Sequence, residues 1–552
     1  MGQPPAAPRN ALAWAMLAYL LGVLLLGYPA LSGGFLVTPI SDQYIGGFPV
    51  RDFAAQSLKA GLGIPLWNPY LFGGLPYVAA MHGDIFYPTF ILRALLPTDV
   101  AMTLGFMIHM VLAGTLTYAF CRAMGLSFYA SLLGGAAYMM SGPIASYVSP
   151  GHDGKLYVSA LLPLMLLFLL RGVREGRLWA WGGLALTTGL GVLSPHPQLL
   201  QYMLLTAGSF ALYWAFSERD GSCLETRVAV RRLAFALGAV LLGGLIGAIQ
   251  YVPVMEYVPW SPRAGGTDYA FATSYSFPIE ELVNTYLPEF TGMLDNYWGR
   301  NRIHFHSEYL GVIVLILASA AIGATGKAAA LSRSFKLFLL GVLVVSLAWA
   351  LGGNTPFYRL VYAVVPGTKF FRAPSTIIYV TTFAVSLFAA IGAERVLSGW
   401  FSRRFIFAWG TVAAVIALLG VSGGLTNLGT VIVGNSAMSD RVAANGGALA
   451  IGAVRSLVFA LLGLAVLWGA GQGRFTARAA ALGLVVLVAT DLWSIERKYW
   501  RFSKPASDLY GSDATIEYLK ARKDSARVIA VPLNDAYAYH DPMLTGDGLM
   551  VH

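Results

Sequence analysis

Charged residues are scarce in this sequence of 552 residues: Asp, Glu, Lys and Arg make up only 12% of it, against roughly 25% in an ordinary soluble protein. Hydrophobic residues make up 57%, and this bias extends over nearly the whole length, which excludes a soluble protein with a single membrane anchor. In a bilayer only helices and closed barrels satisfy every backbone polar group. Because the apolar runs are continuous and do not alternate, they predict membrane-spanning helices and not barrel strands.

The sequence also lacks a disulfide framework and the common nucleotide-binding motifs. Its two cysteines, Cys121 and Cys223, both fall in regions that we expect on the cytoplasmic side, where thiols stay reduced. There is no Walker A loop, Rossmann fingerprint or nucleophile elbow. If the protein is an enzyme, the free energy for its reaction would therefore come from an activated substrate and not from a bound nucleotide. A lipid phosphate that carries an activated group would be such a substrate.

Apolar segments of about 20 residues, the length that spans a bilayer, recur along the chain. Residues 1–10 lack a cleavable signal, so the first segment is read as a retained helix. A short piece at 86–96 could be re-entrant. We predict about 13 transmembrane helices, at 11–32, 100–121, 127–147, 155–170, 178–194, 198–216, 233–254, 309–325, 335–351, 374–393, 404–421, 447–469 and 476–494.

Charge predicts how these helices are oriented. The net charge of +10 could suggest a nucleic-acid partner, but the basic residues gather in short connections on one side, as the positive-inside rule describes. This places the N-terminus in the cytoplasm and, with an odd number of spans, the C-terminus outside. Most carboxylates fall in the opposite, outer connections. Because acidic residues contribute little to orientation, their concentration there indicates a function on that face.

The outer connections are long, and loops beyond about 15 residues are usually functional or disordered. The segments 33–97 and 255–308 are rich in aromatic residues and proline, so we expect ordered loops with interfacial helices. Pro49 and Gly61 bracket one such helix, with Asp52 in its first turn. The sequence thus predicts a transmembrane domain over 1–494. Residues 495–552 resemble the start of a soluble outer domain, with a helix at 512–523 and a strand at 527–531, and we expect that domain to be truncated.

The first outer connection holds the best candidate for a catalytic acid or base. Asp42 lies near the end of the first span, beside Gln43, where a carboxylate could act as a general base or bind a metal. A solvated loop acid or a helix cap would explain it equally well. The helix dipole accounts for Asp52. His82 and Asp84 form a possible acid–base or ligand pair.

A second cluster, His152, Asp153 and Lys155, begins the fourth predicted span. Three ionisable groups at the start of an apolar helix are unfavourable without partners, which favours function over a lysine that only reaches the interface. The turn at 194–198 contains His196 and reads as structural. His304, His306 and Glu308 alternate, so an extended chain could present them to a metal. We expect no certain cofactor, a possible divalent metal, and unknown metal ligands.

Basic residues on the predicted outer face break the positive-inside pattern. Lys369 and Arg372 could hold a phosphate, since a guanidinium binds phosphate with two hydrogen bonds. Arg263, in the second long connection, is a further candidate. Anchoring to lipid headgroups would also explain these residues.

Six segments, in this order, resemble the YfhO family of bacterial membrane proteins, within the GT-C class of polyprenyl-phosphate-sugar-dependent glycosyltransferases. They are Ser41–Gln43, Pro65–Pro69, Gly73–Pro76, Gly83–Pro88, Gly151–Lys155 and Phe371–Pro374. The resemblance implies an all-α, GT-C-like bundle whose first outer loop holds the catalytic acid, and Asp42 matches that position. It also implies an enzyme of the bacterial inner membrane that modifies envelope polymers or glycolipids.

The leading hypothesis is therefore an inverting glycosyltransferase that moves a sugar from a polyprenyl-phosphate donor to an envelope glycan or lipid on the outer face. Asp42 would deprotonate the acceptor, Lys369 and Arg372 would hold the leaving phosphate, and the second cluster would line the site. Gln43, Asp52, His82, Asp84 and Arg263 are further candidate substrate-binding residues. A transporter or lipid-linked-sugar flippase, which would need charged or broken helices at mid-membrane, and an assembly scaffold are the alternatives.

Overall fold

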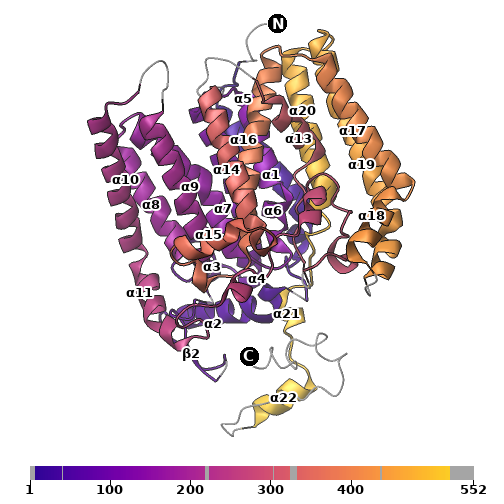
Figure 1. Cartoon of the computed structure of the whole chain (residues 1–552). Helices are drawn as coiled ribbons and strands as arrows, with labels where there is room; N and C mark the ends of the chain where they lie inside the picture. The colour runs from indigo at the N-terminus through magenta and orange to yellow at the C-terminus, as the bar shows by residue number, and fades with distance from the viewer. Residues whose placement is uncertain are drawn as a thin grey trace.

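The computed structural model describes residues 6–39, 41–71, 73–81, 83–217, 223–301, 304–323, 332–434 and 438–522. It is almost entirely helical, and helices packed side by side form a bundle (Figure 1). Within the described residues, ten helical segments are long and apolar enough to cross a membrane. The chain is thus a multi-pass helical membrane protein, as predicted.

Each of the thirteen predicted spans coincides with a helix or a pair of consecutive helices. The long ones are α1 (Ala11–Gly27), α4 (Thr98–Ala123), α7 (Asp153–Leu169), α9 (Pro197–Phe216), α10 (Thr226–Ile246), α14 (Arg333–Ala350), α16 (Ile378–Leu397), α17 (Arg403–Val421), α19 (Ser439–Gly471) and α20 (Ala477–Glu496). Three predicted spans hold shorter helices, namely α5 (Phe128–Met139) with α6 (Gly142–Ala145), α8 (Trp179–Leu193) and α13 (Val312–Ala320).

The centre of the bundle is formed by α4, α5, α7 and α16, and α10 and α17 lie at its edges (Figure 1). Within the most apolar stretch of each segment, 89% of the residues are buried for α16 but only 17% for α17, whose apolar surface is left for lipid. Close approach of the central helices depends on small residues. A Cβ atom at Gly392 of α16 would lie 1.8 Å from the carbonyl oxygen of Leu317 on α13, so any larger side chain would separate these helices.

The connections that hold the candidate residues gather at one end of the bundle, opposite the start of α1 (Figure 1). The first long connection contains α2 (Phe48–Lys59), as predicted, then a hairpin of β1 (Trp67–Asn68) and β2 (Leu75–Pro76), and α3 (Ile91–Leu95). The second follows α11 (Ala248–Tyr257) and contains α12 (Tyr269–Ala272). The remaining helices are α15 (Phe357–Val364), α18 (Gly424–Val433), α21 (Ala506–Leu509) and α22 (Ala514–Ala521).

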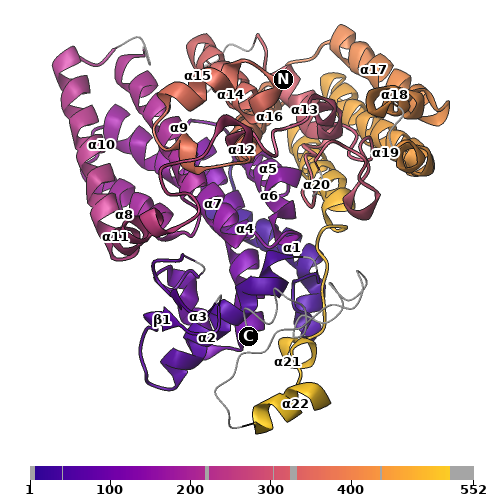
Figure 2. The same ribbon diagram turned by 60° about the horizontal axis from the view of Figure 1, so that its bottom comes forward.

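The segment after α20 packs against the first long connection (Figure 2). Phe35 and Ser503 form an antiparallel bridge, and the ring of Tyr510 stacks on that of Phe48 at 4.6 Å. Helix α22 confirms the polar helix predicted at 512–523, whereas the strand predicted at 527–531 lies outside the described residues.

Candidate active site

The motif residues of the first long connection fold into a compact unit beside α4 and α7. Trp67 pairs with Pro76 and Asn68 with Leu75, so two of the sequence motifs form one hairpin. A helical turn, Gln43–Gly47, leads directly into α2. The amide of Asp42 donates to the carbonyl of Pro150 at 3.0 Å, which joins the start of this connection to the segment before α7.

Asp42 and His152 form a pair across these two segments. The His152 Nε2 atom lies 3.2 Å from an Asp42 carboxylate oxygen. Burial, with the nearby Lys155 ammonium, holds the pKa of His152 well below its usual range, so this imidazole is neutral at pH 7. Its Nδ1 atom is buried without a hydrogen-bond partner among the described residues. We therefore assign the hydrogen to Nε2, which donates to Asp42.

The Asp42 carboxylate combines access to water with a perturbed ionisation. Its side chain is 76% exposed. Surrounding protein nevertheless raises the pKa of Asp42 above the usual carboxyl value, and the positive charges of Lys155 and Arg372 only partly oppose this effect. A carboxylate that is accessible, raised in pKa and oriented by a histidine has the properties of a general base.

Lys155 is a buried cation on the first turns of α7. It is 7% exposed, and its Nζ atom lies 6.0 Å from the centre of the Tyr147 ring. Among the described residues, no carboxylate lies within ion-pair distance of this ammonium group, although Asp42 is close enough to interact with it electrostatically. A buried amine without a counter-ion is unfavourable unless a ligand supplies the negative charge.

Three exposed cations lie next to this cluster: Arg263, Lys369 and Arg372. The guanidinium groups of Arg263 and Arg372 both lie 5.7 Å from the centre of the Phe271 ring, so the two side chains converge on one aromatic residue. The Gln198 side chain donates to the carbonyl of Arg372 at 2.6 Å, which fixes the backbone beside this arginine. In the described part of the chain, none of the three cations has an acidic partner within 4.0 Å.

Asp84 and Asp153 lie instead in a buried ion network with two arginines. Arg51 contacts Asp153 at 2.6 Å and Asp84 at 3.2 Å, and Arg93 contacts Asp84 through both terminal nitrogens of its guanidinium group. Burial opposes ionisation of Asp84, but the two arginines hold its pKa below the usual value. The binding of substrate by these two acids stays a prediction, and their observed contacts join the first long connection to α7.

Gln43 connects this network to the Asp42–His152 pair. Its side chain accepts from Arg51 at 3.3 Å and donates to the carbonyl of Gly151 at 2.8 Å. Gly151 has a φ of +80°, and a Cβ atom there would lie 2.5 Å from Gln43, so only glycine fits between Gln43 and His152. Gln43 is 3% exposed, which suits a positioning role.

The explanation of Asp52 by the helix dipole is wrong. Helix α2 begins at Phe48, and the turn before it is also helical, so Asp52 does not lie in a first turn. Its carboxylate instead accepts a hydrogen bond from the Thr98 hydroxyl at 2.6 Å, at the start of α4. His82 lies outside the described residues.

Two histidines belong to this cluster although the sequence did not assign them to it. His196, which we read as part of a turn, caps α9 and interacts electrostatically with both Lys155 and His152. The ring of His306 lies 5.2 Å from that of His152. Both lie in connections distant from Asp42 in the sequence. The one sequence feature that pointed to them was their place on the predicted carboxylate-rich face.

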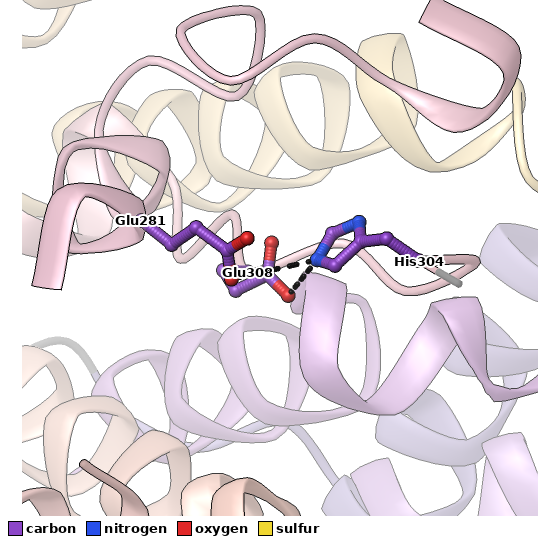
Figure 3. Close-up of side chains that lie close together, drawn as sticks. All are labelled: Glu281, His304 and Glu308. Carbon is purple, nitrogen blue, oxygen red and sulfur yellow. Dashed lines mark hydrogen bonds and ion pairs between the residues drawn. The ribbon is translucent and has the colours of Figure 1, made fainter. Parts of the chain in front are cut away.

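The alternation of His304, His306 and Glu308 suggested a metal site, and metal binding by these residues stays a prediction. The structure brings His304 and Glu308 together with Glu281 (Figure 3), whereas the ring of His306 lies beside that of His152. The ligand atoms of Glu281, His304 and Glu308 all lie within 4.8 Å of one another.

No protein-family model matches the chain, and no curated protein matches it, so membership of the YfhO family stays a prediction. Among solved structures, ArnT from Cupriavidus metallidurans bound to undecaprenyl phosphate aligns with 97% of this chain and 84% of its own, at 12% identity and a TM-score of 0.47. The oligosaccharyltransferase AglB from Archaeoglobus fulgidus, in complex with an inhibitory peptide and a dolichol-phosphate, aligns with 93% of this chain and 59% of its own, at 12% identity and a TM-score of 0.41.

The arabinosyltransferase EmbB from Mycobacterium smegmatis aligns with 95% of this chain and 45% of its own, at 14% identity and a TM-score of 0.39. Scores below 0.5 do not assign an activity, so the functional argument below depends on the site itself.

Proposed function

We propose that this protein is a GT-C-like membrane glycosyltransferase of the bacterial inner membrane, which transfers a sugar from a polyprenyl-phosphate donor to an envelope glycan or lipid. The observation that supports it most directly is the pairing of the accessible Asp42 carboxylate with His152, next to the buried ammonium of Lys155, which no carboxylate of the described residues contacts at 4.0 Å or less. A base and an anion-binding group side by side are what transfer from a lipid phosphate to a hydroxyl needs.

In the proposed step, Asp42 accepts the proton of the acceptor hydroxyl while the acceptor oxygen forms a bond to the anomeric carbon. The bond between that carbon and the phosphate oxygen breaks on the opposite face, which inverts the configuration. The electron pair leaves with the lipid phosphate, and Lys369 and Arg372 stabilise its charge. Lys155 interacts electrostatically with both Asp42 and Arg372, so we expect it to contact the phosphate as the bond breaks.

A transporter or flippase is less well supported by the same observations. The connections that hold the candidate residues gather at one end of the bundle, opposite the start of α1 (Figure 1). Arg455, the main exception, hydrogen-bonds Ser494 and lies 3.7 Å from Asp491, so its charge is paired inside the bundle. This arrangement favours chemistry on one face over passage between two.

The direct test is sugar transfer from polyprenyl-phosphate hexoses in membranes that contain the Asp42→Asn variant. A general base contributes roughly 100- to 10,000-fold to a rate, so we expect transfer to fall at least about 100-fold. Because the raised pKa of Asp42 governs the reactive form, wild-type transfer should decline on acidification at a pH above about 3.9. Residual transfer by the variant should lack this decline.

Asp295→Asn is the matched control. The Asp295 side chain is 75% exposed and also faces a basic residue, Arg501 at 3.6 Å, yet it lies outside the cluster. Its variant should retain wild-type transfer. Undiminished transfer by Asp42→Asn would refute the proposed base.

A further inference from the structure

Two buried carboxylates, Glu281 and Glu308, share a single histidine. The side chains of Glu281 and His304 are 2% and 7% exposed, and that of Glu308 is 10% exposed. The His304 Nε2 atom lies 2.9 Å from Glu308 and 3.6 Å from Glu281. Within the described residues no arginine or lysine pairs with either carboxylate at 4.0 Å or less. One protonated imidazole balances only one of two buried carboxylates, so the second must hold a proton or meet another cation.

Two of the three side chains, His304 and Glu281, are also oriented by Tyr297. The Tyr297 ring stacks on the His304 ring at 4.2 Å with an angle of 6°, and the Tyr297 hydroxyl donates to the far oxygen of Glu281. Figure 3 shows Glu281 and Glu308 both directed toward the same nitrogen of His304. Groups that orient ligands in this way are typical of protein metal sites, where outer contacts fix each ligand before the metal binds.

We propose that Glu281, His304 and Glu308 form a binding site for one divalent transition metal ion, with Zn²⁺ or Mn²⁺ as the expected occupants. Two carboxylate oxygens and one imidazole nitrogen suit these ions, and three protein ligands leave a coordination position open. The cation would take the place of the hydrogen between Nε2 and the carboxylates. Its two positive charges would balance the two negative charges of Glu281 and Glu308.

The proposed metal site lies on the same segment as His306, which contacts the Asp42–His152 pair. His306, two residues from one ligand and two from the other, contacts His152. The next residue, Ser307, is held by two hydrogen bonds. Its amide donates to the Ser146 hydroxyl and its own hydroxyl donates to Glu496, each at 2.9 Å. A metal bound at His304 and Glu308 would therefore hold the segment that places His306 beside the Asp42–His152 pair. Metal binding itself does not depend on the proposed sugar transfer.

The experiment measures metal binding by the purified full chain. The protein is stripped with a chelator and then titrated with ZnCl₂ and, separately, MnCl₂, with bound metal counted by mass spectrometry and affinity measured by calorimetry. We expect one ion per chain, and an affinity at least tenfold weaker in both Glu281→Gln and Glu308→Gln. Glu280→Gln is the control, because Glu280 is adjacent in sequence but pairs with Arg300, and its variant should bind as the wild type does.

A second measurement needs no variant and so does not depend on whether the variants fold. Co²⁺ added to the stripped wild-type protein should give the visible absorption of a four- or five-coordinate site with oxygen and nitrogen ligands. Failure of the wild-type protein to bind either Zn²⁺ or Mn²⁺ in a one-to-one ratio would overturn the proposal. Unchanged affinity in both glutamine variants would overturn the assignment of the ligands. Neither readout involves sugar transfer, so the two proposals can fail separately.

Discussion

Replacing Arg51 with methionine tests whether the buried ion network holds the first long connection to the bundle. Arg51 is 4% exposed and donates to four acceptors: the carboxylates of Asp84 and Asp153, the side chain of Gln43 and the carbonyl of Gly47. Methionine keeps most of the apolar volume of the side chain but none of these bonds. The substitution therefore removes charge and hydrogen bonds without opening a large cavity.

The two acids would respond differently to this loss. Asp84 would keep Arg93, which binds it through two nitrogens at 2.8 and 3.1 Å. Among the described residues, Asp153 would keep the backbone amide of Gly154, at 2.8 Å, as its one hydrogen-bond donor. Removing one partner of a buried ion pair costs about 3–5 kcal/mol. Because one of the two acids stays paired, we expect the lower end, a loss of about 3 kcal/mol in the free energy of unfolding.

Equilibrium unfolding in mixed detergent micelles would measure this loss, with the melting temperature as a second readout. Adding Asp153→Asn to Arg51→Met should restore part of the stability, because it removes the carboxylate left unpaired. Arg93→Met should cost less than Arg51→Met, since Arg51 still contacts Asp84. A loss below about 1 kcal/mol for Arg51→Met, the level of an exposed ion pair, would refute the reasoning.

Two further predictions concern the cluster and the orientation of the chain. Lys155→Met should raise the melting temperature, because it removes a buried cation that no carboxylate in the described ranges contacts at 4.0 Å or less. It should also lower sugar transfer at least about 100-fold, a trade-off typical of functional groups. A variant that is both less stable and fully active would contradict this. Cys223 is exposed and Cys121 is buried, so a membrane-impermeant maleimide should label Cys223 only after cells are permeabilised, and labelling in intact cells would contradict a cytoplasmic position.

The sequence was sufficient to predict the helices because long apolar runs have few alternatives in a membrane. The predicted boundaries fail where a helix is short or broken. In its described part, 309–323, the span predicted at 309–325 holds the nine-residue helix α13, preceded by a segment without helix or strand that holds His304 and Glu308. Hydropathy measures only how apolar a stretch is, so it cannot tell a helix from an extended apolar segment that is buried in the bundle.

The candidate site was predictable only in part, since it depends on contacts between distant segments. Asp42 and His152 stand out as polar residues in apolar surroundings, and the structure brings them together. The partners of Asp84 could not be predicted, because Arg51 and Arg93 are ordinary basic residues whose pairing is set by the folding of the connection. Asp52 failed for a local reason: a helical turn precedes α2, which no residue pattern in the segment had indicated.

The charge balance separates the two groups of ionisable residues at this end of the bundle. In the network, Arg51 and Arg93 face Asp84 and Asp153, so two positive charges meet two negative charges and no ligand is needed. In the neighbouring cluster, Asp42 interacts electrostatically with Lys155 and Arg372, and the adjacent Arg263 and Lys369 add further positive charge. Lys155 is the buried cation of this cluster, and burying a charge is costly unless an oppositely charged group joins it. A phosphate group satisfies that requirement and a neutral sugar does not, so the phosphate of the donor, more than its sugar, should determine what this site binds.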